Sequence, residues 1–141
     1  MKKKIKDYKL LIVASEFYPE ITKNLVSEAQ IHCNKLKIKY DIFFVNGSLE
    51  IPTLISMKIR KKRYDAAVAL GCIIRGQTKH FDLIASAITD SLLQLSIINA
   101  IPITNAVLTC DNMKQAVVRS SKKLNRSKEA IDSALSILKN F

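Results

Sequence analysis

The chain has 141 residues, of which 48% are hydrophobic and 25% are charged, and its formal net charge is +11. This length and composition are typical of one soluble globular domain, so we expect a single domain over residues 1–141. No uninterrupted apolar run reaches the roughly 18 residues of a membrane span, and the basic N-terminus lacks the apolar core of a signal peptide. We therefore expect a cytoplasmic protein without a membrane partner.

The cysteines and the basic residues disfavour two further classes. Cys33, Cys72 and Cys110 are odd in number and lack C-x-x-C spacing, which argues against a disulfide framework and a metal site. The positive charge is compatible with nucleic-acid binding, but the basic residues are scattered and are not interleaved with aromatic residues. We favour a solvated surface that attracts anionic substrates, with nucleic-acid binding as the weaker alternative.

Short apolar runs alternate with helical periodicities along the chain. The runs predict strands at residues 9–14, 40–45, 66–70 and 103–108. Helices are expected from the N-cap candidate Thr22, from Pro52, from Phe81 to about Asn99, at 113–120 and at 129–141. This order predicts an α/β protein with a four-stranded parallel sheet between two helical layers. Three glycines are too few for a G-x-G-x-x-G or Walker loop.

The segment from Gly71 to Lys79 is expected to be the loop between the third strand and the helix at Phe81. Ligands of open α/β sheets bind outside the carboxyl ends of the strands, where this loop should lie. His80 can exchange a proton near neutral pH, and backbone N–H groups at Gln77 and Thr78 can bind an anion at the helix N-terminus.

Loops after the first two strands should converge on the same edge of the sheet. They carry Phe17 and the run Ser48, Leu49 and Glu50, and the fourth strand carries Asn105 near its middle. Phe17 can stack on a flat heterocycle, although a core position is equally compatible with its type. The sequence therefore predicts a small cleft with an aromatic wall.

Several residues have two interpretations. Arg119 can bind a phosphate with two parallel hydrogen bonds, or it can complement the negative end of its helix. For Arg75 we favour a structural ion pair with an acidic group such as Asp82 over phosphate binding. Cys72 is read as a small apolar wall, and His32 as a structural residue without polar neighbours of interest.

The helix at residues 81–99 is apolar around most of its circumference. Leu83, Ala87, Leu93, Ile97 and Ile98 lie off the stripe that faces the sheet. One side of such a helix should face solvent in an isolated protomer, so this pattern predicts a homo-oligomer in which the helix packs against its symmetry mates.

Two motifs make the chain similar to the 6,7-dimethyl-8-ribityllumazine synthase family. The first is Gly47-Ser48-Leu49-Glu50-Ile51-Pro52, and the second is Gly71-Cys72-Ile73-Ile74-Arg75-Gly76-Gln77-Thr78-Lys79-His80-Phe81-Asp82. Val107-Leu108-Thr109, Gln115-Ala116 and Arg119 follow at matching spacing. The resemblance implies a flavodoxin-like fold. It also implies a cofactor-free condensation of 5-amino-6-(D-ribitylamino)uracil with 3,4-dihydroxy-2-butanone 4-phosphate in riboflavin biosynthesis.

The resemblance assigns a role to each candidate residue. Phe17 would stack on the pyrimidine, and His80 would transfer protons. Phosphate would be bound by Gln77, Thr78 and, from a neighbouring subunit, Arg119. The uracil and ribityl chain would be held by Ser48, Leu49, Glu50, Cys72, Ile73, Ile74 and, from the adjacent subunit, Asn105.

The chain departs from many family members in its first loop, Ser15-Glu16-Phe17-Tyr18, and in having Asn105 where many have Phe. The resemblance implies assembly as pentamers or as sixty-subunit shells, in which the N-terminal extension adds a strand to a neighbour. The extension of this chain is short, which favours a pentamer, or stacked pentamers, over the shell. The alternative function is a non-catalytic relative that binds a flavin or a lumazine.

Overall fold

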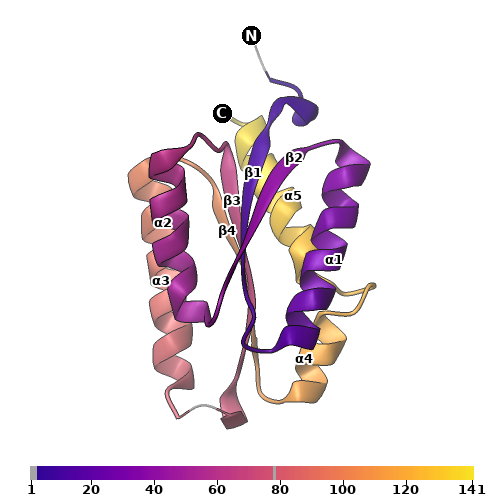
Figure 1. Cartoon of the computed structure of the whole chain (residues 1–141), viewed down its shortest axis with the longest axis vertical. Coiled ribbons are helices and arrows are strands. Elements are labelled where there is room, and N and C mark those ends of the chain that lie inside the picture. The colour runs from indigo at the N-terminus through magenta and orange to yellow at the C-terminus, as the bar shows by residue number, and fades with distance from the viewer. Residues whose placement is uncertain (1–2, 78) are drawn as a thin grey trace.

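The computed structural model describes residues 3–77 and 79–141 (Figure 1). The prediction for Thr78 therefore lies outside the described residues. The main elements are β1 (Lys9–Ser15), α1 (Pro19–Leu36), β2 (Lys39–Val45), α2 (Ile51–Lys61), β3 (Ala66–Ile74), α3 (Phe81–Asn99), β4 (Ile103–Cys110), α4 (Met113–Arg119) and α5 (Arg126–Lys139). Short 3₁₀ turns occupy η1 (Ile5–Asp7), η2 (Ser48–Glu50) and η3 (Arg75–Gln77).

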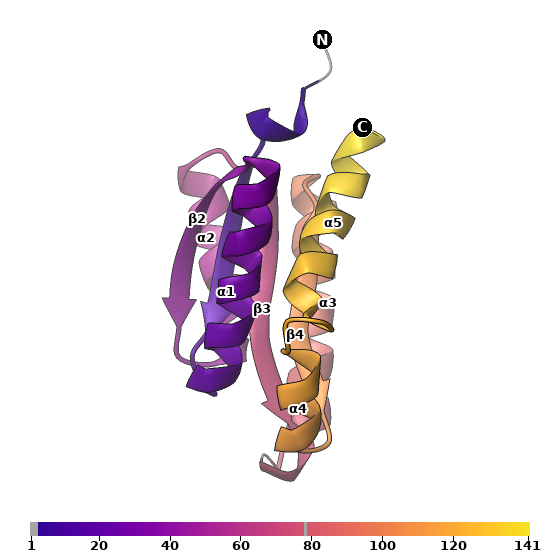
Figure 2. The same ribbon diagram turned by 90° about the vertical axis from the view of Figure 1, so that its right-hand side faces the viewer.

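The four strands form one parallel sheet in the order β2-β1-β3-β4. Helices α2 and α3 cover one face, and α1, α4 and α5 cover the other (Figures 1 and 2). This is the predicted three-layer α/β/α sandwich with the flavodoxin-like strand order. After β1 the chain forms β2 on one side of β1, and it then crosses to the other side of β1 to form β3. The order therefore reverses between β1 and β3, and their carboxyl ends lie at the bottom of Figure 1.

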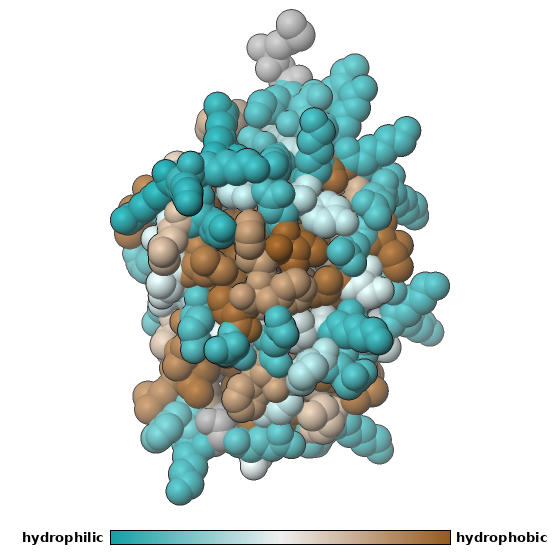
Figure 3. Space-filling model, viewed as in Figure 1, coloured by the Kyte–Doolittle hydropathy of each residue, from teal (hydrophilic) through white to brown (hydrophobic). Residues whose placement is uncertain are grey.

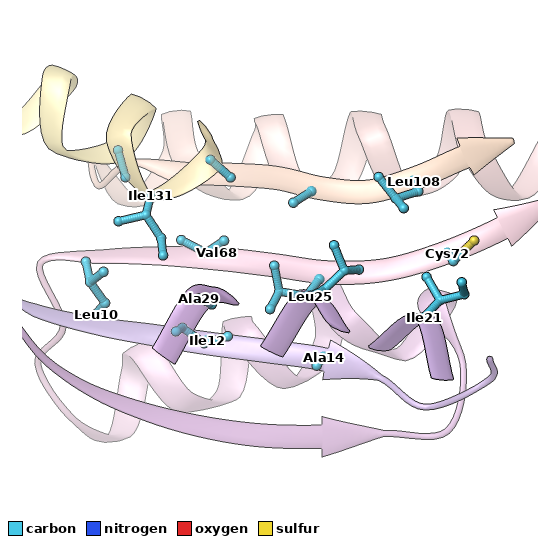
Figure 4. Packing of buried hydrophobic residues seen from close by; sticks show 14 of the residues in the cluster. Leu10, Ile12, Ala14, Ile21, Leu25, Ala29, Val68, Cys72, Leu108 and Ile131 are labelled. Atoms are coloured by element: carbon cyan, nitrogen blue, oxygen red, sulfur yellow. The ribbon is translucent and has the colours of Figure 1, made fainter. Parts of the chain in front are cut away.

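Alternate residues of the buried strands face opposite helical layers. Leu10, Ile12 and Ala14 of β1 pack toward α1 and α5 with Leu25 and Ile131, as Figure 4 shows. The intervening β1 side chains belong to the second cluster, which α2 and α3 complete. A central parallel strand is buried on both faces, which is why β1 and β3 are continuous apolar runs.

Several boundaries differ from the predictions. The loop predicted at Gly71 begins only after Ile74, because residues 71–74 continue β3 and pair with residues 107–110 of β4. Helix α1 begins at Pro19 rather than Thr22, since proline fits the first turn, and Tyr18 is the N-cap. Helix α5 begins at Arg126 rather than residue 129, with the side chain of Asn125 accepting a hydrogen bond from the Ser127 N–H.

Helix α3 leaves an apolar face outside the protomer. Ile98 is 75% exposed and Leu83 is 70% exposed, and Leu93 and Ile97 are also exposed. Among the described residues, α3 is the one helix long and apolar enough to cross a membrane, and 17% of that stretch is buried. Two aspartates interrupt this stretch, so it is not an uninterrupted apolar run. Apolar atoms also interrupt the hydrophilic surface over β2 and α2 (Figure 3).

Candidate functional site

A cavity of about 340 Å³ opens at the carboxyl ends of β1, β2 and β3. It lies where the strand order reverses, which is the usual ligand position in open α/β sheets. The cavity is lined by seven residues predicted from the sequence, namely Phe17, Ser48, Leu49, Glu50, Cys72, Ile73 and Ile74. Tyr18, Asn46, Gly47 and Ile84 complete the lining.

Two serines and a glycine form a tight contact beside this cavity. The Oγ atoms of Ser15 and Ser48 lie 3.2 Å apart in a buried hydrogen bond. A Cβ atom on Gly71 would lie 3.1 Å from each of these oxygens. Thr22 Oγ1 donates a hydrogen bond to the Ser15 carbonyl oxygen, which attaches the first turn of α1 to the end of β1. The absence of a side chain at Gly71 therefore allows β3 to approach both serines.

Phe17 is 63% exposed, so the core position that was its alternative is wrong. Its ring meets the Tyr18 ring edge-on, with centroids 4.9 Å apart and an interplanar angle of 77°. The exposed ring of Phe17 therefore borders the cavity, where it can contact a flat ligand. The carboxylate of Glu50 lies close to Gly47, since a Cβ atom on Gly47 would be 3.1 Å from Oε2 of Glu50.

The cavity wall at Cys72 is apolar, and the Cys72 thiol is expected to be unreactive. Burial, with smaller contributions from the Cys110 thiol, raises the pKa of Cys72 to about 12. A neutral thiol is a poor nucleophile, which agrees with the reading of Cys72 as a wall. Burial also raises the pKa of Tyr18, so this phenol stays protonated at neutral pH and can donate a hydrogen bond. All three cysteines are free and buried.

The other predicted residues that the structure describes, Gln77, His80, Asn105 and Arg119, do not line this cavity within one protomer. Gln77 ends η3, and His80 is the N-cap residue of α3, whose carbonyl accepts a hydrogen bond of 2.9 Å from the N–H of Ile84. Ile84 lines the cavity one turn further along α3. Asn105 is exposed on the edge strand β4, and its Oδ1 accepts a hydrogen bond of 2.8 Å from the Val107 N–H.

Arg119 ends α4 and points back to the end of β4. Its Nη1 donates to the Thr109 carbonyl oxygen at 3.0 Å and lies 3.8 Å from the Cys110 sulfur. Arg75 forms the ion pair predicted with Asp82, with a shortest separation of 3.3 Å. His32 does have a polar partner, contrary to the prediction, because its Nε2 lies 2.6 Å from Oδ1 of Asp132.

Sequence reasoning missed four cavity residues, namely Tyr18, Asn46, Gly47 and Ile84. Tyr18 follows Phe17 directly, and its position depends on α1 beginning at Pro19. The helical periodicity places Ile84 on the face of α3 that packs on the sheet. Ile84 does pack against that core cluster, and it also lines the cavity.

A second hollow, of about 1010 Å³, lies at the opposite end of the sheet. Basic and apolar side chains line it together, including Arg60, Arg63, Ile97 and Ile101. It is far from the edge where strand-end loops converge and shares no lining residue with the smaller cavity. Among residues 3–77 and 79–141, no group of three or more His, Cys, Asp or Glu side chains is arranged to hold a metal ion.

The fold and the site define a flavodoxin-like α/β protein with a small cavity at its topological switch point. A sequence profile of the 6,7-dimethyl-8-ribityllumazine synthase family matches residues 7–141. The chain belongs to this family.

Curated relatives agree with this assignment. The chain is 36% identical to the 6,7-dimethyl-8-ribityllumazine synthase of Methylorubrum populi, over 92% of this chain and 80% of the relative. It is 39% identical to the protein of that name from Bartonella bacilliformis, over 92% and 87% of the two chains. The protein of that name from Limosilactobacillus reuteri is 36% identical over 79% and 74%.

Proposed function

We propose that this protein is the transferase of riboflavin biosynthesis that forms 6,7-dimethyl-8-ribityllumazine. Its substrates are 5-amino-6-(D-ribitylamino)uracil and 3,4-dihydroxy-2-butanone 4-phosphate, and the reaction releases phosphate and water. Family membership supports this activity. The observation that carries it is the cavity at the switch point, which the exposed ring of Phe17 lines together with Ser48 and Glu50.

The cavity suits the uracil substrate. In the proposal, Phe17 stacks on the pyrimidine ring while Ser48, Glu50 and backbone groups near Leu49 bind its polar edges. Cys72, Ile73 and Ile74 contact the ring and the ribityl chain from the end of β3. A flat heterocycle bound between an aromatic ring and apolar walls gains from stacking and burial together.

The second substrate binds where anion-binding groups are expected. Gln77 and Thr78 precede α3 in the sequence, and Arg119 reaches the phosphate from a neighbouring subunit. Asn105 is supplied by an adjacent subunit as well. A shared site is compatible with the geometry of one protomer, in which Arg119 and Asn105, like Gln77 and His80, do not line the cavity of their own chain.

The proposed chemistry needs little from the protein beyond orientation. The amine of the uracil attacks the ketone, a Schiff base forms, phosphate leaves and the ring closes, with His80 transferring protons. Holding two reactants in register gives effective molarities of about 10⁵ M or more. General acid–base help adds about 10²–10⁴-fold.

The assembly in this proposal is a cytoplasmic homopentamer of single-domain chains. The exposed apolar face of α3, including Leu83 and Ile98, supports the oligomer, because a face this apolar is usually covered. Neighbouring protomers would then bury their α3 helices together and place each Arg119 at the adjacent cavity.

The test is to incubate the purified chain with both substrates and to follow lumazine fluorescence and phosphate release together. The proposal expects product and phosphate to appear in equal amounts. Tight binding of a lumazine or flavin without product formation would support the non-catalytic alternative instead.

A further inference from the structure

The Arg75 guanidinium, just after the end of β3, contacts three residues from two parts of the chain. Its Nε donates to Oδ1 of Asp111 at 3.2 Å, and its Nη1 donates to the two carboxylate oxygens of Asp82 at 3.3 and 3.4 Å. Its Cζ lies 4.4 Å from the centroid of the buried Phe81 ring. Phe81 and Asp82 begin α3, whereas Asp111 follows β4. One side chain therefore joins the start of α3 to the segment before α4.

Asp111 is itself bound to α4. Its N–H donates to Oε1 of Gln115 at 2.8 Å, and Nε2 of Gln115 donates to Oδ2 of Asp111 at 3.4 Å. Gln115 and Arg119 are one helical turn apart on α4. Because Arg119 also donates to the Thr109 carbonyl, both ends of α4 are tied to residues 109–111.

The same contacts disfavour Arg75 as a phosphate ligand. Two carboxylates lie within hydrogen-bonding distance of its guanidinium and neutralise its charge locally. The Cζ atom of the guanidinium also lies over the Phe81 ring, in cation–π contact. A planar fork directed at two carboxylates fixes an orientation that a lysine ammonium cannot reproduce.

We infer that Arg75 is a positioning residue that links the start of α3, where His80 is the N-cap residue, to α4 through Asp111. The inference rests on the proposed function, in which His80 and Gln77 serve the cavity of their own chain and Arg119 serves the neighbour's. Arg75 thus aligns groups that belong to two adjacent sites. Each exposed ion pair is weak by itself, but small displacements of reacting groups have large effects on rate.

Arg75→Gln, Arg75→Lys, Asp111→Asn and the Arg75→Gln/Asp111→Asn double variant test the link. The readouts are kcat, the KM for the butanone phosphate and the inhibition constant of inorganic phosphate. Lys62→Gln is the matched control. Lys62 is 54% exposed, as Arg75 is, and it pairs with Asp41 at 3.2 Å near the amino ends of the strands.

We expect each single variant to raise the KM and the phosphate inhibition constant about three- to tenfold, with Arg75→Lys no better than Arg75→Gln. The double variant should lose no more than the singles, because both changes break one link. Wild-type constants in Arg75→Gln, additive losses in the double variant, or an equal loss in Lys62→Gln would overturn the inference.

Two further measurements keep the test decisive. If Arg75→Gln does not fold, Asp111→Asn still tests the link, because it leaves the contacts of Arg75 with Asp82 and Phe81 in place. If the wild type makes no lumazine, the proposed function fails. Calorimetric titration with inorganic phosphate then tests the link separately, and equal affinity in wild type and Asp111→Asn would overturn it.

Discussion

The hydroxyl oxygens of Ser15 and Ser48 lie 3.2 Å apart, and the bare α-carbon of Gly71 packs against both. We predict that Gly71→Ala forces the two serines apart, since its Cβ would lie 3.1 Å from each oxygen. Overpacking of this kind costs about 1–3 kcal/mol of unfolding free energy, and displacement of Ser48 should also raise the KM for the uracil substrate.

Urea unfolding and steady-state kinetics check this prediction. Gly76→Ala is the stability control, because its added Cβ would be 3.9 Å from the nearest atom, the Asp111 carbonyl oxygen. We expect the control to change the unfolding free energy by less than about 1 kcal/mol. Equal destabilisation by the two variants would show that the serine contact is not responsible.

His80 and Arg119 should differ in how much activity their loss removes. We expect His80→Ala to reduce turnover by about 10²-fold, the lower end for general acid–base catalysis, because orientation remains. Arg119→Ala should reduce kcat/KM for the phosphate substrate further, and Arg119→Lys should restore it only in part. Single-turnover kinetics in which Arg119→Ala behaves as the wild type would remove Arg119 from the site.

The hydrogen bond between His32 and Asp132 joins α1 to α5, which lie side by side on the same face of the sheet. The buried ring of His32 has its Nε2 2.6 Å from Oδ1 of Asp132. We predict that Asp132→Ala lowers the unfolding free energy by about 1–3 kcal/mol, because the buried ring loses its partner. Asp132→Asn retains an acceptor oxygen and should cost less. Urea unfolding at neutral pH that ranks the two variants equally would contradict this assignment.

Buried thiols predict a loss of stability in alkali. Burial raises the pKa of Cys33 to about 11 and that of Cys72 to about 12, from an ordinary value of 9.0. Since the folded state holds these protons more tightly, the stabilisation is complete below pH 9.0 and is lost as the pH rises through 11 and 12. Cys33→Ala should therefore flatten the dependence of unfolding free energy on pH above 9.0. An unchanged slope would contradict the shift.

The exposed face of α3 predicts how assembly responds to charge. Ile98→Asp places a carboxylate at a position that is 75% exposed in one protomer, so it should leave the chain folded but dissociate the oligomer. Ile31→Asp, at 53% exposure on α1, is the matched control. Native mass spectrometry and circular dichroism distinguish the outcomes, and an intact oligomer in Ile98→Asp would place the interface elsewhere.

Local patterns were sufficient to predict the alternation of strands and helices and the edge of the sheet where the cavity lies. They were insufficient where the end of an element or the contact of a side chain depends on a residue far away in the sequence. Gly71 was read as a strand end, but pairing with β4 carries β3 on to Ile74. His32 and Asp132 are 100 positions apart, as Arg75 and Asp111 are 36 apart, so neither contact leaves a local signal.

The central claim is a catalytic site shared between neighbouring chains, and mixed assembly of His80→Ala with Arg119→Ala chains tests it directly. Where an Arg119→Ala chain keeps its own His80 beside the Arg119 of a His80→Ala neighbour, one complete site forms. Each site needs an Arg119→Ala chain at one position and a His80→Ala chain at the next, and random mixing in equal amounts fills each position correctly about half the time. The mixture should then restore about a quarter of the wild-type lumazine synthesis. Activity no greater than the average of the two separate variants would contradict a shared site.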